Sequence, residues 1–123
     1  MNMTKFYNFD QNNSGGSFVV DNDLCHRLYI EADSADEATA IAESMGVYFD
    51  GCESGMDCEC CGDRWYRLWT HDGITFPYKF DNATFDTIED YVQHIVDNWG
   101  WTAPDARIFY KDGTRKEFYE NGK

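Results

Sequence analysis

A strand pattern that leads directly into a helix pattern is the feature that most limits the folds open to this chain. Residues 24–30 alternate between two faces, and one face carries Leu24, His26, Leu28 and Ile30. Ser34 and Glu37 then form a capping box, small apolar residues follow at helical spacing, and Gly46 supplies a stop. A strand followed at once by such a helix predicts a helix packed on a sheet, which is the start of an α+β fold.

The other expected elements continue this pattern. They are strands at residues 5–9 and 17–20, a pair of strands at 65–69 and 74–80 around the turn His71-Asp72-Gly73, a helix at 87–98, and a hairpin of 107–111 and 114–119 around Asp112-Gly113. For the second helix, Asp86 is the expected N-cap and Gly100 the expected end. The predicted fold is therefore α+β, with an antiparallel sheet, two helices, a C-terminal β-hairpin and a long cysteine-bearing loop.

Length and composition indicate one folded domain. The chain has 123 residues, of which 42% are hydrophobic and 17% aromatic, which suits a single modest core. We expect a single domain over residues 1–123, with an acidic first half (1–63) and an aromatic-rich second half (64–123). The chain has no apolar run near the ~20 residues of a membrane helix. Its first residues do not resemble an apolar signal core, so a cytosolic location is expected.

Residues 57–65 contain a C-x-x-C-G knuckle formed by Cys58, Cys61 and Gly62. Such a knuckle presents two thiolates to one metal ion, and cytosolic thiols stay reduced, so a structural zinc site is expected. The other candidate ligands are Cys60, Cys52, Cys25, His26 and His71. The alternative is that the cysteines pack in reduced form beneath aromatic side chains without a metal. No other cofactor is expected.

The sequence does not carry a recognisable catalytic signature. No H-E-x-x-H or H-x-E motif accompanies the knuckle, and the glycine loop at 14–17 lacks the lysine of a phosphate-binding loop. The neighbouring acids Asp57, Glu59 and Asp63 disfavour thiolates, which argues against a redox dithiol. We therefore expect a protein that is not an enzyme. A small metal-dependent enzyme with an open coordination position is an alternative.

Acidic residues are concentrated in one part of the chain. The net charge is −13, and residues 21–63 hold twelve acids against a single base, Arg27. This charge repels nucleic acid and anionic membranes, and it favours a partner protein with a basic surface. The acids expected to face that partner, in place of nucleic-acid phosphates, are Asp36, Glu37, Glu43, Asp50, Glu53, Asp57 and Glu59. The alternative is that the charge serves only solubility.

Arg64, Trp65 and Arg67 form a second candidate site. Together with Trp99 and Trp101 they offer aromatic faces beside guanidinium groups, a combination that binds nucleotides and other small ligands. A small-ligand binding protein, such as a sponge for a nucleotide signal, is therefore an alternative function. The competing interpretation is that these aromatic residues, at strand spacing, belong to the core.

Four stretches resemble a family of small, mostly uncharacterised bacteriophage accessory proteins. They are KFYNF (5–9), NNSGGSFVVD (12–21), LCHRLYIEA (24–32) and DCxCCGDRW (57–65). The resemblance covers roughly residues 4–66, and from Leu68 onward we recognise no similarity. It implies a phage gene product in the host bacterial cytoplasm, and it supplies neither an activity nor catalytic residues.

Charge and resemblance together define the expected function. We expect a non-enzymatic bacteriophage accessory protein that binds a host protein and inhibits or redirects it, in host takeover or counter-defence. Acidic mimicry of nucleic acid is one way in which it would bind.

Overall fold

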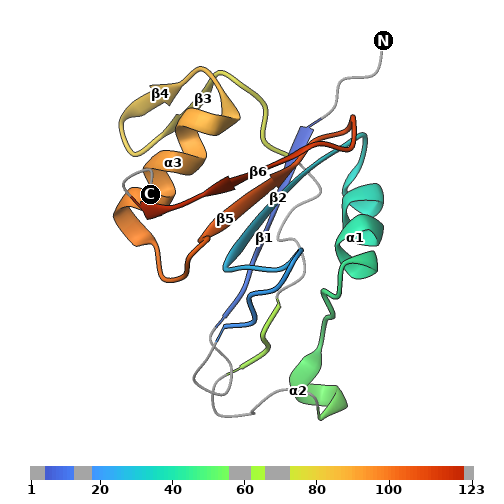
Figure 1. Cartoon of the computed structure of the whole chain (residues 1–123). Coiled ribbons are helices and arrows are strands. Elements are labelled where there is room, and N and C mark those ends of the chain that lie inside the picture. The colour runs from blue at the N-terminus through green and yellow to red at the C-terminus, as the bar shows by residue number, and fades with distance from the viewer. Residues whose placement is uncertain (1–4, 13–17, 56–61, 66–72, 121–123) are drawn as a thin grey trace.

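The main sheet has four strands in the order β1-β2-β5-β6 (Figure 1). The structure is a computed structural model that describes residues 5–12, 18–55, 62–65 and 73–120. The strands are β1 (Lys5–Asp10), β2 (Arg27–Ala32), β5 (Ala106–Phe109) and β6 (Arg115–Phe118). The outer pairs are antiparallel, whereas the central pair β2–β5 is parallel. The α+β class is confirmed, and the sheet is mixed because a long crossover between residues 32 and 106 returns the chain in the same direction.

Helices cover both faces of this sheet. Helix α1 (Ala35–Ser44) lies on one face and α3 (Ile88–Trp99) on the other (Figure 1). Neighbouring residues of β2 point to opposite sides, so that Leu28 packs in the cluster under α1 and Tyr29 in the cluster under α3. The middle of β2 is therefore buried on both faces, which explains its apolar run Leu28-Tyr29-Ile30.

Local signals set the ends of α1 as predicted. The Ser34 hydroxyl accepts a hydrogen bond from the backbone N–H of Glu37 at 3.1 Å. The carboxylate of Glu37 accepts in turn from the N–H of Asp33 at 3.3 Å, one residue before the usual partner in a capping box. Gly46 follows the helix with a φ of 116°, a conformation that glycine adopts without strain. A short helix, α2 (Gly51–Ser54), comes next.

The region after residue 73 differs from the expected hairpin. Strands β3 (Tyr78–Phe80) and β4 (Ala83–Phe85) pair with each other in a separate two-stranded sheet. Asp81 and Asn82 form the turn with φ values of 54° and 61°, the left-handed pair of a two-residue hairpin loop. The expected partner strand 65–69 and its turn lie largely outside the described residues. Within them, Ile74 forms an isolated bridge to Phe6, so residues 74–80 are not one continuous strand.

Four further predictions have clear outcomes. Helix α3 is capped by Thr87, whose hydroxyl accepts from the N–H of Asp90 at 3.2 Å, so the expectation of Asp86 as the N-cap was wrong. Gly100 ends α3 as predicted. The C-terminal hairpin is confirmed, with Gly113 at a φ of 92° in its turn. Residues 18–20 do not form the strand expected at 17–20.

Among the described residues, none of the helices could cross a membrane.

Candidate partner-binding surface

The large apolar side chains exposed in the described part of the chain gather at one end of the main sheet. Val19 and Val20 are 37% and 42% exposed, and Trp99 and Trp101 are 45% and 69% exposed. The two valines precede β2 and the two tryptophans precede β5. Because β2 and β5 are parallel, the segments that enter them meet at the same edge, as Figure 1 shows. With Phe18, these four residues define what we call the tryptophan surface.

A buried carboxylate fixes the loop that carries Trp101. Asp105 is 0% exposed. Its Oδ1 atom accepts hydrogen bonds from the backbone N–H groups of Trp101 at 2.7 Å and Thr102 at 3.0 Å. The same oxygen lies 2.9 Å from Nδ1 of His26, and Oδ2 accepts from the guanidinium of Arg27. The loop and the start of β2 therefore share one anchor.

The charge state of Asp105 follows from these bonds. Burial would raise the pKa of this carboxyl group, but the hydrogen bonds from His26 and from the N–H groups of Trp101 and Thr102 lower it to about 2. The group is therefore ionised at neutral pH. A buried carboxylate is tolerated only when its lone pairs are satisfied, and here four donors satisfy them.

Arg27 extends the anchor to the end of α3. Its guanidinium donates to the carbonyl oxygen of Trp99 at 3.1 Å, and its Nε atom lies 4.0 Å from the carboxylate of Asp10. The backbones of Trp99 and Trp101 are thus both held by a buried polar network. The indole of Trp101 is presented from a fixed loop and that of Trp99 from the end of α3, which lowers the entropy cost of binding a partner.

The two tryptophan side chains have different neighbours. The ring of Phe18 lies 4.8 Å from the imidazole of His26 and 6.0 Å from the indole of Trp101. The indole of Trp99 lies 6.0 Å from His94 and 6.2 Å from Phe80, beside the β3–β4 hairpin. Trp101 therefore belongs with His26, whereas Trp99 belongs with the aromatic cluster on α3.

Most of the predicted metal ligands lie outside the described residues. This holds for Cys58, Cys60, Cys61 and His71. Of the rest, Cys52 is half-buried in α2, and its backbone N–H donates to Asp63 at 2.9 Å. Cys25 is fully buried, which raises the pKa of its thiol to about 12 and makes it a poor thiolate ligand. The described residues contain no group of three or more metal-ligating side chains, so the zinc site stays a prediction.

The predicted acidic surface is smaller than the sequence suggested. Glu37 forms an ion pair with Lys111 of the β5–β6 hairpin, and Lys111 also pairs with Asp33 at 3.1 Å. Arg115 of the same hairpin pairs with Asp23 at 2.7 Å. Bases of the second half thus offset acids of the first half.

The other predicted acids fall into two groups. Asp57 and Glu59 lie outside the described residues, whereas Asp36, Glu43, Asp50 and Glu53 are exposed on α1 and around α2. Within the part of the chain that the structure describes, Asp36, Glu43 and Glu53 form no ion pair. These three carry the uncompensated charge of this face.

The proposed small-ligand residues do not form an open stacking site in the described residues. Trp65 is 1% exposed and packs in the core cluster under α1. Arg64 donates to the side chain of Gln11 at 3.0 Å, and Arg67 lies outside the described residues. The ring face of Trp65 is therefore covered by protein, as the core interpretation expected.

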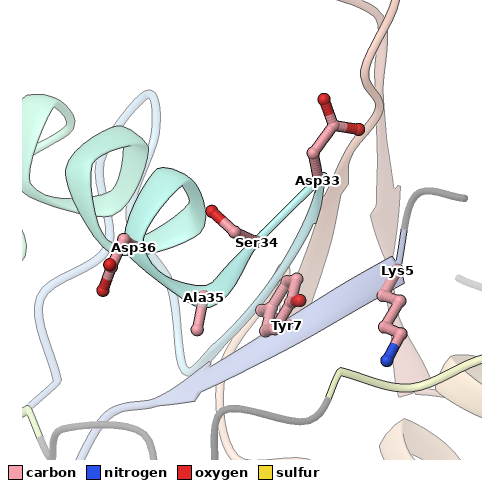
Figure 2. Close-up of a pocket in the computed structure, with 6 residues that line it drawn as sticks. All are labelled: Lys5, Tyr7, Asp33, Ser34, Ala35 and Asp36. Carbon is pink, nitrogen blue, oxygen red and sulfur yellow. The ribbon is translucent and has the colours of Figure 1, made fainter. Parts of the chain in front are cut away.

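A pocket of about 490 Å³ opens where β1 and α1 begin (Figure 2). Its lining consists of Lys5, Tyr7, Asp33, Ser34, Ala35 and Asp36. Figure 2 shows Lys5 and Asp36 at opposite sides with Tyr7 between them. The carboxylate of Asp33 is paired with Lys111, and Figure 2 shows the ammonium group of Lys5 directed away from the carboxylates of Asp33 and Asp36. Among the described residues, the lining therefore does not bring charges of one sign together in a way that would select an ion.

Fold and site together define a small α+β domain with an exposed tryptophan surface on a buried polar anchor. The chain belongs to the family described as "Domain of unknown function (DUF7296)", whose model matches residues 4–123. The match covers both halves of the chain, whereas the four stretches that resemble bacteriophage proteins lie within residues 5–65. The description of the family carries no attribution to bacteriophages. Neither a curated protein nor a solved structure matches the chain.

Proposed function

We propose that this chain is a non-enzymatic binding protein that engages a basic partner protein through the tryptophan surface and inhibits or redirects it. The observation that carries this proposal is Trp101, which is 69% exposed although its backbone is fixed by a buried carboxylate. Tryptophan is enriched among the residues that dominate protein–protein binding, and contiguous exposed apolar patches mark such sites. An exposed indole on a rigid support is explained if it contacts another molecule.

The charge of the chain supports a basic partner. A net charge of −13 attracts cationic proteins over distances of about a Debye length and speeds their encounter. The uncompensated acids Asp36 and Glu43 on α1 would contribute to this steering. They would also imitate nucleic-acid phosphates, so that the chain competes with nucleic acid for a basic surface of the partner. Glu53 on α2 adds to the same charge.

The biological setting rests on the resemblance of residues 5–32 and 57–65 to bacteriophage accessory proteins. In that setting the partner is a host protein of the bacterial cytoplasm, and the outcome is host takeover or counter-defence. A structural zinc at the knuckle would hold residues 57–65 in place without taking part in binding.

The burial of Trp65 favours a protein partner over the small-ligand alternative. A small-ligand site built on Trp65 would need the ring face that the core now covers. A metal-dependent enzyme stays an alternative, because its candidate ligands Cys58, Cys60, Cys61 and His71 lie outside the described residues.

Affinity capture from bacterial lysate tests the proposal. The wild-type chain is expected to retain a basic protein, identifiable by mass spectrometry, and to lose it as salt rises. Trp101→Ala is expected to abolish this capture while the variant remains folded by circular dichroism. Capture of the same protein by Trp101→Ala at wild-type strength would contradict the proposal.

A charge-matched pair of variants tests the mimicry separately. Asp36→Asn/Glu43→Gln and Asp81→Asn/Glu120→Gln each remove two exposed negative charges, but only the first pair lies on α1. Mimicry predicts a larger loss of low-salt capture for the α1 pair. Equal losses of capture for the two pairs would contradict mimicry, because the acids of α1 would then act only through the overall negative charge of the chain.

A further inference from the structure

We infer that the groove between β6 and α3 binds an extended basic segment of a second protein, which adds to the open edge of β6 as a further strand. This goes beyond the proposed function, because the groove would hold a different protein from the partner on the tryptophan surface. The inference is carried by the backbone groups at the edge of β6, by a pocket beside them and by the charges of that pocket.

Strand β6 has one open side. Among the described strands it pairs with β5 alone, which leaves it at an edge of the main sheet (Figure 1). The carbonyl oxygen of Phe118 points toward β5, where it accepts from the N–H of Asp105 at 2.9 Å. Successive residues of an antiparallel strand direct their backbone groups to opposite sides. The backbone groups of Arg115 and Glu117 therefore point away from β5.

The outward backbone groups of Arg115 and Glu117 have not been used by the fold. Within the described part of the chain their N–H and C=O groups form no hydrogen bond, and both residues are exposed. Tyr119 is the next residue with this orientation, and its carbonyl oxygen accepts from the side chain of Gln93 at 2.9 Å. The free stretch thus offers two donors and two acceptors, which an antiparallel segment would use in two residue pairs.

A pocket of about 350 Å³ lies between this edge and α3. Its lining comes from Glu89, Asp90 and Gln93 of α3 and from residues 116–119. Lys116 lies on the α3 face, with its ammonium 5.6 Å from the ring centroid of Phe118. Directly opposite residues of paired strands share a face, so alternate side chains of an added segment would enter this pocket. Addition of a strand to an exposed edge is an established way in which proteins recognise extended segments.

The pocket favours a basic side chain. The carboxylates of Glu89 and Asp90 form no ion pair within the described residues. Glu117 is already paired with Arg107 at 2.7 Å. The charges that remain in the lining are these two carboxylates and the ammonium of Lys116, which leaves a local charge of −1.

A basic side chain opposite Thr114 would reach these carboxylates. Thr114 shares the face of Lys116, and its carbonyl oxygen accepts from the N–H of Tyr110 at 2.8 Å. The hydroxyl of Tyr110 in turn donates to Glu89 at 2.6 Å. The position opposite Thr114 is therefore close to Glu89, and a base there does not lie directly opposite Lys116.

The charges along the edge argue against two other occupants. Arg115, Lys116 and Glu117 discourage the addition of an apolar strand. A second copy of this chain that paired Arg115 with Glu117 would set Lys116 against its own counterpart, and like charges directly opposite are destabilising. The net charge of −13 on each copy adds to this repulsion.

Titration with three capped hexapeptides tests strand addition. The first is Thr-Val-Thr-Val-Lys-Thr, whose lysine would lie opposite Thr114 when its two valines pair with Glu117 and Arg115. The second has glutamate in place of lysine, and the third keeps the lysine but is N-methylated at both valines, which removes two backbone donors. Binding is followed by NMR shifts of the Arg115 and Glu117 amides. Compared with the first peptide, the glutamate peptide is expected to bind about threefold to tenfold more weakly, and the N-methylated peptide about tenfold more weakly.

A matched pair of double variants assigns the pocket. Glu89→Gln/Asp90→Asn removes both carboxylates of α3 and leaves an oxygen for the Tyr110 hydroxyl, and it is expected to weaken binding of the lysine peptide about fivefold. Asp36→Asn/Glu43→Gln removes the same kinds of charge from α1, on the other face of the sheet. This control is expected to keep wild-type affinity for the peptide within about twofold.

The outcomes separate this inference from the proposed function. Trp101→Ala is expected to bind the lysine peptide like wild type, and loss of binding in this variant would place the peptide on the tryptophan surface and overturn the inference. Equal affinity for the plain and N-methylated peptides would exclude strand addition, and equal losses in the two double variants would exclude the pocket. Unchanged Arg115 and Glu117 amide shifts at the solubility limit of the peptide would also overturn it. The proposed function is tested separately, by partner capture with Trp101→Ala.

Discussion

Replacing Asp105 with asparagine tests the anchor beneath the tryptophan surface. The asparagine side chain has nearly the same shape, and its single oxygen can still accept from the N–H groups of Trp101 and Thr102. Its amide nitrogen must then face Arg27, so a donor replaces the acceptor and the guanidinium loses its buried counter-charge. Breaking a buried ion pair on one side costs about 3–5 kcal/mol. We therefore expect Asp105→Asn to lower the free energy of unfolding by that amount.

Urea unfolding followed by far-UV circular dichroism measures this loss. For a slope near 2 kcal/mol per molar urea, the midpoint is expected to fall by about 2 M. Asp81→Asn is the matched control, because it makes the same chemical change at an exposed turn position that asparagine tolerates well. The control is expected to stay within about 0.5 kcal/mol of wild type. A loss below about 1 kcal/mol for Asp105→Asn would refute the assigned role of this carboxylate.

Three further predictions concern stability. The pKa of Asp105 is lowered from 3.8 to about 2 in the folded chain, so its ionisation should add about 2 kcal/mol to the free energy of unfolding above pH 4. This contribution should be lost as the pH falls from about 4 to about 2. Urea midpoints measured across this range should show the loss in wild type and lack it in Asp105→Asn. Ser34→Ala removes the N-cap of α1 and should cost about 1 kcal/mol in urea unfolding, whereas Ser44→Ala, in the last turn, should cost clearly less. Ile108→Ala empties a fully buried position under α3 and should cost about 2–5 kcal/mol, and a thermal midpoint equal to wild type would contradict the described core.

Elements that depend on near neighbours were predictable from the sequence. Ser34 caps α1 through a residue three positions away, and Gly113 turns the C-terminal hairpin through its own positive φ. The turn at Asp81 and Asn82 was also readable, since both residue types tolerate the left-handed conformation. It was missed because residues 74–80 were expected to form one strand that pairs with residues 65–69, which precede it in the chain.

The candidate site could not be predicted because distant residues form it. Asp105 meets His26 and Arg27 across 79 and 78 positions, and only the parallel pairing of β2 with β5 brings them together. The sequence does not distinguish the burial of the tryptophans either. Trp65 and Trp101 looked alike as stacking residues, yet one is 1% and the other 69% exposed. Trp65 packs in the core cluster under α1, whereas Trp101 lies in the loop between α3 and β5, and the sequence does not show which of the two meets a core.

The affinity of the captured partner for Trp101→Ala tests the central claim most directly. Isothermal titration calorimetry would compare the binding of the purified partner to wild type, to Trp101→Ala and to Lys116→Ala. Lys116 is an exposed residue of β6 that lies beside Glu89 and Asp90 at the start of α3, at the other end of this helix from Trp99. If Trp101 dominates the interface, its loss weakens binding by about 2 kcal/mol or more, roughly a thirtyfold rise in Kd, while Lys116→Ala binds like wild type. A Kd for Trp101→Ala within about twofold of wild type would contradict the account.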